Sequence, residues 1–404
     1  MGANIYFFVQ HYNLFKRIIN TIPNRLLKSF LLISFFYILI SCGTYIKTVK
    51  KEYIAISSEK VKRQNFGKVY FVDSLHQYLD FKINNFNHKM FFDTGAGELL
   101  ITNPKFKIDT SKIITSKNIY GFDHKVSTLM STYSLDSISN DLISIEQKYA
   151  LIQQKAHSLC DVPDFDGIIN NFYFYTDSYV VSINYEEGYI EFVNDFVKDE
   201  YQEVAAKFSG MSNKFSILIK INGIEDYFLF DTGNKSSVIV NKEYKNKIKN
   251  YLYSISFTSK SVGSNLVLNS LDYYLEKIQM GNGTTFSYPL GLDINSKRNT
   301  LNLKFIQNFN WMIDVANQKV YYKPIDVAKL QDISNNKLIS NRVLTMEHQN
   351  NLIISYINFE SPLYKIGKRI IKVADEIITT ENICFYRDLL NNTENWDSIK
   401  IEFE

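Results

Sequence analysis

The feature that most constrains how this 404-residue chain folds is an internal repeat. Residues 82–95 align with residues 220–233 at an offset of 138 without a gap, and seven of the fourteen positions are identical. Each segment predicts two strands around a tight turn, whose central pair is Asn84-Asn85 in one copy and Asn222-Gly223 in the other. Each segment ends in an apolar run followed by Asp-Thr-Gly. We therefore expect two related lobes.

The repeat extends beyond these two segments. Two further pairs of segments match downstream: residues 135–138 with 275–278, and residues 181–192 with 311–323. Short strands separated by turn residues dominate both copies, and no long helical period is present. Residues 66–198 and 199–326 are therefore predicted to be two copies of one mainly β lobe.

The two Asp-Thr-Gly triplets carry the chemistry that the sequence predicts. Two carboxylates held about 3 Å apart cannot both ionise cheaply, so such a pair shares one proton. One carboxylate can then act as general base on a water and the other as general acid towards a carbonyl. We expect Asp93 and Asp231 to be this catalytic pair, which needs no metal or cofactor. The expected supporting residues of the two catalytic loops are Thr94, Gly95, Thr232 and Gly233.

At these triplets the sequence resembles the pepsin–retropepsin superfamily of aspartic proteases, over about 260 residues. The resemblance implies an acid-protease-like pseudo-dimer of two β-barrels, with Asp93 and Asp231 as the catalytic aspartates. The family packs an apolar-apolar-Gly element under each catalytic loop. Residues 166–170 and 300–302 resemble this element, with Asn in place of the final Gly. Since Asn tolerates positive φ better than most residues, we expect it to replace Gly there.

Two alternatives accompany this resemblance. The family has a flap, a hairpin that closes over the substrate and excludes water. Tyr120 and Gly121 lie in the corresponding interval and are the candidate flap tip, although an ordinary hairpin explains the segment equally well. Single lobes of neighbouring chains could also pair, as in retroviral proteases, but the internal repeat makes such pairing unnecessary.

Residues 1–41 are predicted to be a lipoprotein signal peptide. The first 28 residues contain basic residues and no acidic ones, and Phe30–Ile40 forms an apolar run of h-region length. The sequence Leu39-Ile40-Ser41-Cys42 resembles the bacterial lipobox, which implies lipidation of Cys42. An uncleaved signal anchor is the alternative. Residues 42–65 then form a tether.

These N-terminal features predict a lipid-anchored protein of the bacterial cell envelope, with the protease domain outside the cytoplasm. Gly43 and Thr44 follow the cysteine, where the family of lipoproteins retained in the inner membrane has Asp, so we favour the outer membrane.

The C-terminal part of the chain differs from the two lobes. Residues 327–338 are predicted to be a linker. Residues 339–404 resemble a PDZ domain of bacterial proteases, through Ser361–Gly367, Ala374–Ile378 and a helix over 382–390. The resemblance implies that a peptide or a chain terminus binds between an edge strand and this helix. A small α+β cap that packs on the second lobe is the alternative.

Composition and motifs exclude other classes. A net charge of +3 argues against a dedicated nucleic-acid binder. Three cysteines cannot build a disulfide framework or a four-cysteine zinc site. Cys160 and Cys384 are interpreted as buried small apolar residues. The sequence contains no His-Glu-x-x-His, no Walker lysine loop and no Gly-x-Ser-x-Gly.

The sequence therefore predicts a membrane-tethered aspartic endopeptidase with a polypeptide substrate. The alternative is a catalytically inactive envelope lipoprotein that holds peptides with its cleft and its PDZ-like domain.

Overall fold

The computed structural model describes residues 61–404, except 64–66, 73–76, 121–126, 153–158, 161–164, 175–178, 210–213, 261–265, 284, 327–341 and 394. The predicted signal peptide, the lipidation site Cys42 and the linker 327–338 lie outside the described residues. Within the described part, no helix has the length and apolar character needed to cross a bilayer.

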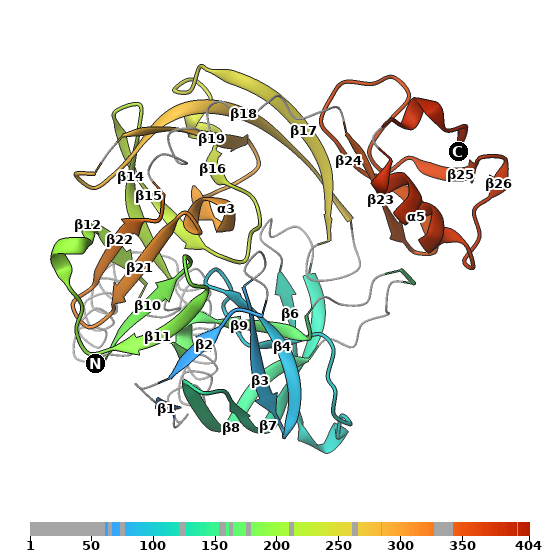
Figure 1. Ribbon diagram of the computed structural model, residues 1–404. Coiled ribbons are helices and arrows are strands. Elements are labelled where there is room, and N and C mark those ends of the chain that lie inside the picture. The colour runs from blue at the N-terminus through green and yellow to red at the C-terminus, as the bar shows by residue number, and fades with distance from the viewer. Residues whose placement is uncertain are drawn as a thin grey trace, which may run out of the picture. The chain divides into compact units, whose positions relative to one another are not determined.

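The chain is mainly β and contains two closed six-stranded barrels (Figure 1). The first barrel has the strand order β8-β5-β9-β4-β3-β7 and closes through a pairing of β7 with β8. Its strands are β3 (Tyr78–Ile83), β4 (Phe86–Asp93), β5 (Leu100–Ile101), β7 (Ser127–Ser139), β8 (Ile143–Ile152) and β9 (Gly167–Asn170). At its edges, β1 (Val61–Arg63) pairs with β8, and β6 (Ile113–Tyr120) pairs with β7.

The second barrel repeats this order with equivalent strands. It runs β14-β15-β20-β16-β19-β18 and closes through a pairing of β14 with β18. Its strands are β14 (Phe215–Ile221), β15 (Ile224–Asp231), β16 (Val238–Asn241), β18 (Leu266–Met280), β19 (Phe286–Asp293) and β20 (Thr300–Asn302). At its edges, β13 (Ala206–Phe208) pairs with β14, and β17 (Tyr251–Lys260) pairs with β18.

The predicted hairpin turns are present in both barrels. Asn84 and Asn85 have φ of 47° and 69°, and Asn222 and Gly223 have φ of 50° and 87°. Positive φ at both central residues is the requirement of a type I′ turn, which matches the twist of the flanking strands. The Asn-Asn and Asn-Gly pairs therefore fix the register of the strand that ends at each aspartate.

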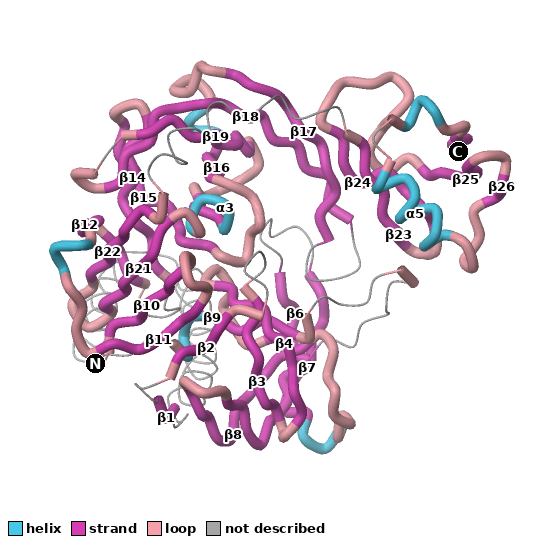
Figure 2. The backbone as a smooth tube through the Cα atoms, in the orientation of Figure 1, coloured by secondary structure: helices cyan, strands magenta, loops and turns pink. Residues whose placement is uncertain are grey.

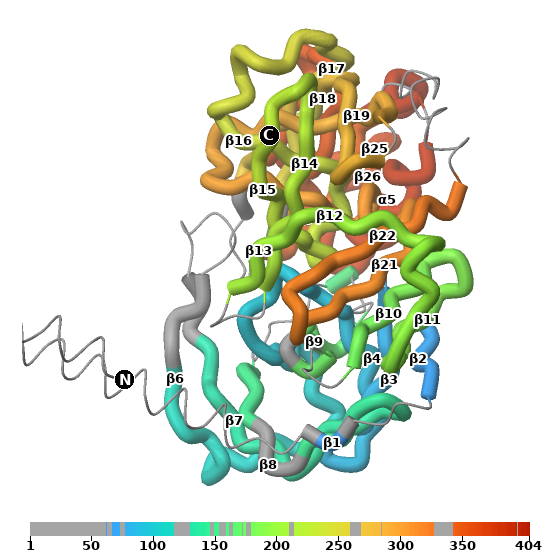
Figure 3. Tube along the Cα trace, turned by 90° about the vertical axis from the view of Figure 1, so that its left-hand side faces the viewer, coloured from blue at the N-terminus to red at the C-terminus, as the bar shows by residue number. Residues whose placement is uncertain are grey.

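A third sheet joins the two halves of the repeat. Its strands are β12 (Gln202–Val204), β22 (Lys319–Pro324), β21 (Phe309–Asp314), β10 (Val180–Asn184), β11 (Tyr189–Val193) and β2 (Lys68–Tyr70). The matched segments 181–192 and 311–323 meet at its centre, where Val181 pairs with Ile313 and Ile183 with Trp311. In Figure 3 these central strands lie between the two barrels. One hydrophobic core runs through this sheet and both barrels.

Within the described residues, helices are few and short (Figure 2). They are η1 (Thr110–Lys112), η2 (Asn171–Tyr173), η3 (Lys198–Glu200), η4 (Lys242–Tyr244) and α3 (Leu303–Ile306), followed near the C-terminus by α5 (Ile383–Asn392) and η6 (Trp396–Ser398).

The C-terminal segment has a hydrophobic core of its own. Its strands are β23 (Val343–His348), β24 (Asn351–Ile357), β25 (Arg369–Val373), β26 (Glu376–Ile377) and β27 (Ile401–Phe403). Strand β24 also pairs with β17, so the sheet of the second barrel continues into this segment. The predicted strand at 352–357 and the helix over 382–390 are present, whereas the likeness to a PDZ domain stays a prediction.

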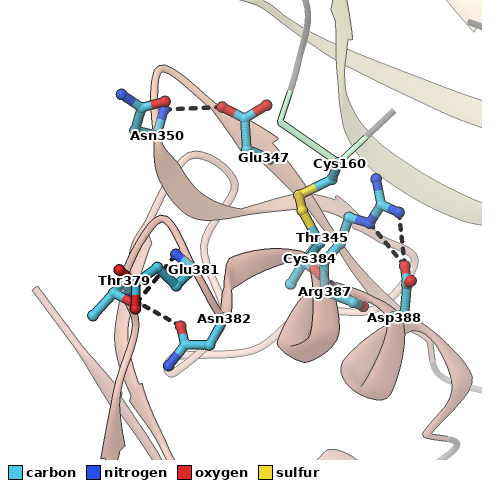
Figure 4. The surroundings of a disulfide bond; sticks show 10 residues. All are labelled: Cys160, Thr345, Glu347, Asn350, Thr379, Glu381, Asn382, Cys384, Arg387 and Asp388. Atoms are coloured by element: carbon cyan, nitrogen blue, oxygen red, sulfur yellow. Dashed lines mark hydrogen bonds and ion pairs between the residues drawn. A yellow bond between two sulfur atoms is a disulfide. The ribbon is translucent and has the colours of Figure 1, made fainter. Parts of the chain in front are cut away.

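The interpretation of Cys160 and Cys384 as merely buried small apolar residues is wrong. They form a disulfide, with Cα atoms 5.0 Å apart although 224 residues separate them in the chain (Figure 4). Cys160 lies between β8 and β9 of the first lobe, and Cys384 lies in α5. The C-terminal segment is therefore bonded covalently to the first lobe and paired through β24 with the second.

Candidate active site

Each Asp-Thr-Gly triplet begins at the last residue of a buried barrel strand. Strand β4 ends at Asp93 and β15 ends at Asp231. Each of these strands pairs in parallel with the segment that resembles the family's apolar-apolar-Gly element, so Asp93 faces Asn170 and Asp231 faces Asn302. The structure therefore brings both predicted elements beside the aspartates.

The expectation that Asn replaces Gly in these elements because of a positive φ is wrong. Asn170 has φ −93° and Asn302 has φ −111°, which is extended backbone that any residue adopts. Neither position requires glycine, because the chain passes directly from the strand into η2 or α3 without a left-handed residue. Both side chains are buried, and the Asn302 amide donates to Ser236 Oγ at 2.7 Å.

The two threonines of the triplets bind each other's loops reciprocally. Thr94 Oγ1 accepts the N–H of Thr232, and Thr232 Oγ1 accepts the N–H of Thr94, both at 3.0 Å. Thr94 Oγ1 donates to the carbonyl of Phe230, and Thr232 Oγ1 donates to the carbonyl of Phe92, both at 2.8 Å. Both threonines are fully buried. The four bonds fix the two Asp-Thr-Gly loops relative to each other.

Two glycines allow the aspartates to approach. A Cβ placed on Gly95 would lie 2.6 Å from Cγ of Asp231, and one placed on Gly233 would overlap the carboxyl of Asp93. Real Cβ atoms do not approach other heavy atoms so closely, so a side chain at either glycine would force the opposite carboxyl to move. Each carboxyl group therefore lies against the loop backbone of the other lobe.

The two carboxyl groups receive different numbers of backbone hydrogen bonds. Asp93 Oδ1 accepts the N–H groups of Gly95 at 2.7 Å and Ala96 at 2.9 Å. Asp231 Oδ1 accepts the N–H of Gly233 at 3.0 Å. Because such bonds stabilise a carboxylate, the surroundings of Asp93 favour the ionised form more than those of Asp231.

Burial raises the pKa of both groups, and the negative charge of Asp93 raises that of Asp231 further. Burial raises the pKa of Asp93, while the N–H groups of Gly95 and Ala96 oppose that rise. Burial and then the negative charge of Asp93 raise the pKa of Asp231 from 3.8 to about 7. Two carboxyls that interact this strongly retain one proton between them over a wide pH range.

Lys214 is a residue near the pair that the sequence reasoning missed. It precedes β14 and is half-buried. Burial lowers the pKa of its ammonium group, and the negative charges of Asp93 and Asp231 oppose that effect. The predicted hairpin at residues 220–233 contains the signal that could have found Lys214. Its first strand runs antiparallel to the strand that carries Asp231, so extending that first strand towards the N-terminus brings Lys214 across from Asp231.

The candidate flap is described only in part. Tyr120 is the last residue of β6 and pairs with Ser127 of β7, so a hairpin does occupy this interval. Gly121 lies outside the described residues, and the flap role stays a prediction. In the second lobe the equivalent hairpin is β17–β18, on which β24 docks.

Comparisons with known proteins add no assignment. No model of a known protein family matches the chain, and no curated protein matches it. Among the described residues, no group of three or more His, Cys, Asp or Glu side chains is arranged to hold a metal ion.

Proposed function

We propose that the protein is an aspartic endopeptidase that hydrolyses peptide bonds with a water held between Asp93 and Asp231. The observation that carries this proposal is the contact of each carboxyl with the glycine of the other lobe's triplet, together with the raised pKa of Asp231. A pair with these properties holds one proton near neutral pH and so supplies a base and an acid at once.

In the proposed reaction Asp93 is the base and Asp231 is the acid. The ionised Asp93 takes a proton from the water while the water oxygen attacks the carbonyl carbon of the scissile bond. Asp231 gives its proton to the carbonyl oxygen, which yields a neutral tetrahedral diol. The proton on Asp93 then passes to the leaving nitrogen, the carbon–nitrogen bond breaks, and a diol hydroxyl returns a proton to Asp231. The two backbone donors on Asp93 support this division of roles.

The location follows from a second proposal. We infer that the mature protein is anchored to the outer membrane through lipidated Cys42, with the two lobes outside the cytoplasm. The disulfide between Cys160 and Cys384 supports an oxidising compartment, because such bonds are rare in the bacterial cytosol.

For the C-terminal segment we propose a PDZ-like role, in which a peptide adds to the edge of β23 beside α5. At this edge Asn391 of α5 accepts the N–H of Thr345 at 2.7 Å and donates to its carbonyl at 3.1 Å. An added peptide strand would replace these two bonds, so Asn391→Ala is expected to increase the affinity for extended peptides.

A peptide-library digest of the full-length protein in detergent tests the protease proposal. The wild type is expected to cleave, while Asp93→Asn and Asp231→Asn each lose activity by about a thousandfold or more, as for other groups that act as a unit. Asp80→Asn on the exposed face of β3 is the matched control and should retain full activity. Hydrolysis that survives either active-site change overturns the proposal.

A statine-type inhibitor separates the enzyme from the alternative of an inactive peptide-binding lipoprotein. A hydroxyl that mimics the tetrahedral diol should bind the wild type tightly and both Asn variants weakly. A folded protein that binds ordinary peptides but neither cleaves them nor prefers the inhibitor supports the alternative.

A further inference from the structure

The register of β14 with β15, extended by two residues towards the N-terminus, places Lys214 opposite Asp231. Strands β14 and β15 pair antiparallel, with Ser216 facing Leu229 and Ile217 facing Phe228. The next step of this register is occupied by the stacked rings of Phe215 and Phe230, whose centroids are 4.7 Å apart. One further step places Lys214 across from Asp231. Directly opposed side chains project from the same face of a sheet, with Cβ atoms about 5 Å apart.

The charges around Lys214 do not cancel. The charged groups whose fields reach it are Asp93, Asp231 and, with the same sign as its own, the exposed Arg298 of the β19–β20 loop. With one proton shared, the aspartate pair carries one negative charge against the two positive charges of Lys214 and Arg298. One more negative charge would neutralise this end of the site.

The ammonium group of Lys214 is available to a ligand. Among the described residues it forms no ion pair within 4.0 Å and no side-chain hydrogen bond, although it is half-buried. A charge that is partly removed from water is costly unless it is paired, and a charge-assisted bond to a carboxylate is the strongest pairing that a lysine makes. The lysine is therefore poised for an anion that the described part of the chain does not place within 4.0 Å of it.

We propose that Lys214 selects substrates with an acidic side chain on one of the two residues that flank the scissile bond. This inference rests on the proposed protease function, because it places the substrate beside Asp231. The carboxylate of the substrate pairs with the ammonium group and completes the charge balance of the site.

Matched peptides test the proposal in the full-length protein. The peptides differ only by Glu or Gln at each flanking position, and kcat/KM is measured for the wild type, Lys214→Met, Lys214→Gln and Lys214→Arg. We expect the wild type to prefer Glu by about tenfold or more at one position, as for a hydrogen bond to a charged group. Lys214→Met and Lys214→Gln lose this preference, and Lys214→Arg retains part of it.

Lys220→Met is the control, since Lys220 is a partly exposed lysine of β14 that pairs with Glu225 at 3.8 Å. It should keep the preference of the wild type. The Glu-to-Gln ratio is internal to each variant, so a partly unfolded variant still gives a valid answer. Equal cleavage of both peptides by the wild type, or a preference that survives in both neutral variants, overturns the proposal.

Failure of the Lys214 proposal can be distinguished from failure of the protease proposal. If the wild type cleaves neither peptide, the protease proposal fails, and statine-type inhibitors with Glu or Gln flanks then report on Lys214 alone. Tighter binding of the Glu inhibitor by the wild type but not by Lys214→Met supports the lysine's role, and equal binding overturns it.

Discussion

Thr94 and Thr232 each complete the backbone hydrogen bonding of the other's loop. Each hydroxyl accepts an N–H from the opposite threonine at 3.0 Å and donates to the carbonyl before the opposite aspartate at 2.8 Å. Neither lobe can satisfy these buried groups alone. The relative position of Asp93 and Asp231 is therefore a property of the assembled pair of lobes.

Replacing either threonine by valine should both destabilise the protein and lower its activity. Thr94→Val leaves the N–H of Thr232 and the carbonyl of Phe230 without their partner. Each unsatisfied buried group costs about 1–3 kcal/mol, so we expect a loss of roughly 2–5 kcal/mol in the free energy of unfolding. Denaturant unfolding of Thr94→Val and Thr232→Val measures it.

The control for this prediction is Thr132→Val on β7, because Thr132 makes no side-chain hydrogen bond with any residue in the described part of the chain. It should change stability by less than about 1 kcal/mol. The double variant Thr94→Val/Thr232→Val should lose less than the sum of the single variants, since the four bonds form one unit. Additive losses would contradict the reciprocal arrangement.

The triplet glycines should be intolerant of even one added carbon. Gly95→Ala and Gly233→Ala place a methyl group against the carboxyl of the opposite aspartate, so the aspartates must separate. We expect kcat to fall by about a hundredfold or more, because a shift of about 1 Å at a reacting group has effects of this size. Gly97→Ala is the matched control in the same loop, since a Cβ there meets nothing within 4 Å. Equal activity of all three variants would contradict the close approach.

The local part of the fold could be predicted from sequence because it depends on local chemistry. The Asn-Asn and Asn-Gly turns specify positive φ, and the apolar runs that end at Asp93 and Asp231 specify buried strands. The repeat then indicated that both copies share one strand plan, and the identical strand orders of the barrels agree with this.

The remaining features depend on contacts between distant segments, to which sequence patterns are insensitive. The bond between Cys160 and Cys384 joins residues whose neighbours carry no pairing signal. Strand β24 pairs with the free edge of β17, and the backbone groups of such an edge can pair with any short strand. The sequence therefore does not specify which strand pairs there. The preference of Asn for positive φ does not determine the backbone at Asn170 and Asn302, since both residues are extended.

Breaking the disulfide should loosen the C-terminal segment without removing the active site. A cross-link over 224 residues restricts the unfolded chain strongly, so Cys160→Ser or Cys384→Ser should cost about 2–5 kcal/mol in stability. Thermal unfolding with and without a dithiol reductant measures this loss. Reduction should lower the wild-type melting temperature to that of the serine variants and leave theirs unchanged. A reductant effect that persists in the double variant Cys160→Ser/Cys384→Ser would contradict it.

Activity should extend from weakly acidic to neutral pH. The pair needs one shared proton, and the pKa of Asp231 is about 7. Activity should therefore fall above pH 7, where Asp231 loses this shared proton and both carboxyls are ionised. Burial also raises the pKa of Asp93, so the acid limb should lie above the ordinary aspartate range near 3.8. A profile of kcat/KM against pH on one peptide measures both limbs. An optimum below pH 3 would contradict the raised pKa values.

The same pKa predicts a stability effect whose sign is the reverse of a salt-bridged aspartate. In the unfolded chain Asp231 loses its proton near pH 3.8, whereas the folded protein keeps it until about pH 7. Between these values the unfolded state is the more ionised one, so the folded protein loses stability as pH rises through this window, and the loss is complete above pH 7. Asp231→Asn removes the ionisation and should therefore be more stable than the wild type at pH 8, by roughly 2–4 kcal/mol. The difference should shrink towards zero below about pH 4. Denaturant unfolding of both proteins at pH 4 and pH 8 tests this, and a difference that does not change with pH would show that the carboxyl of Asp231 is not held protonated in the folded state.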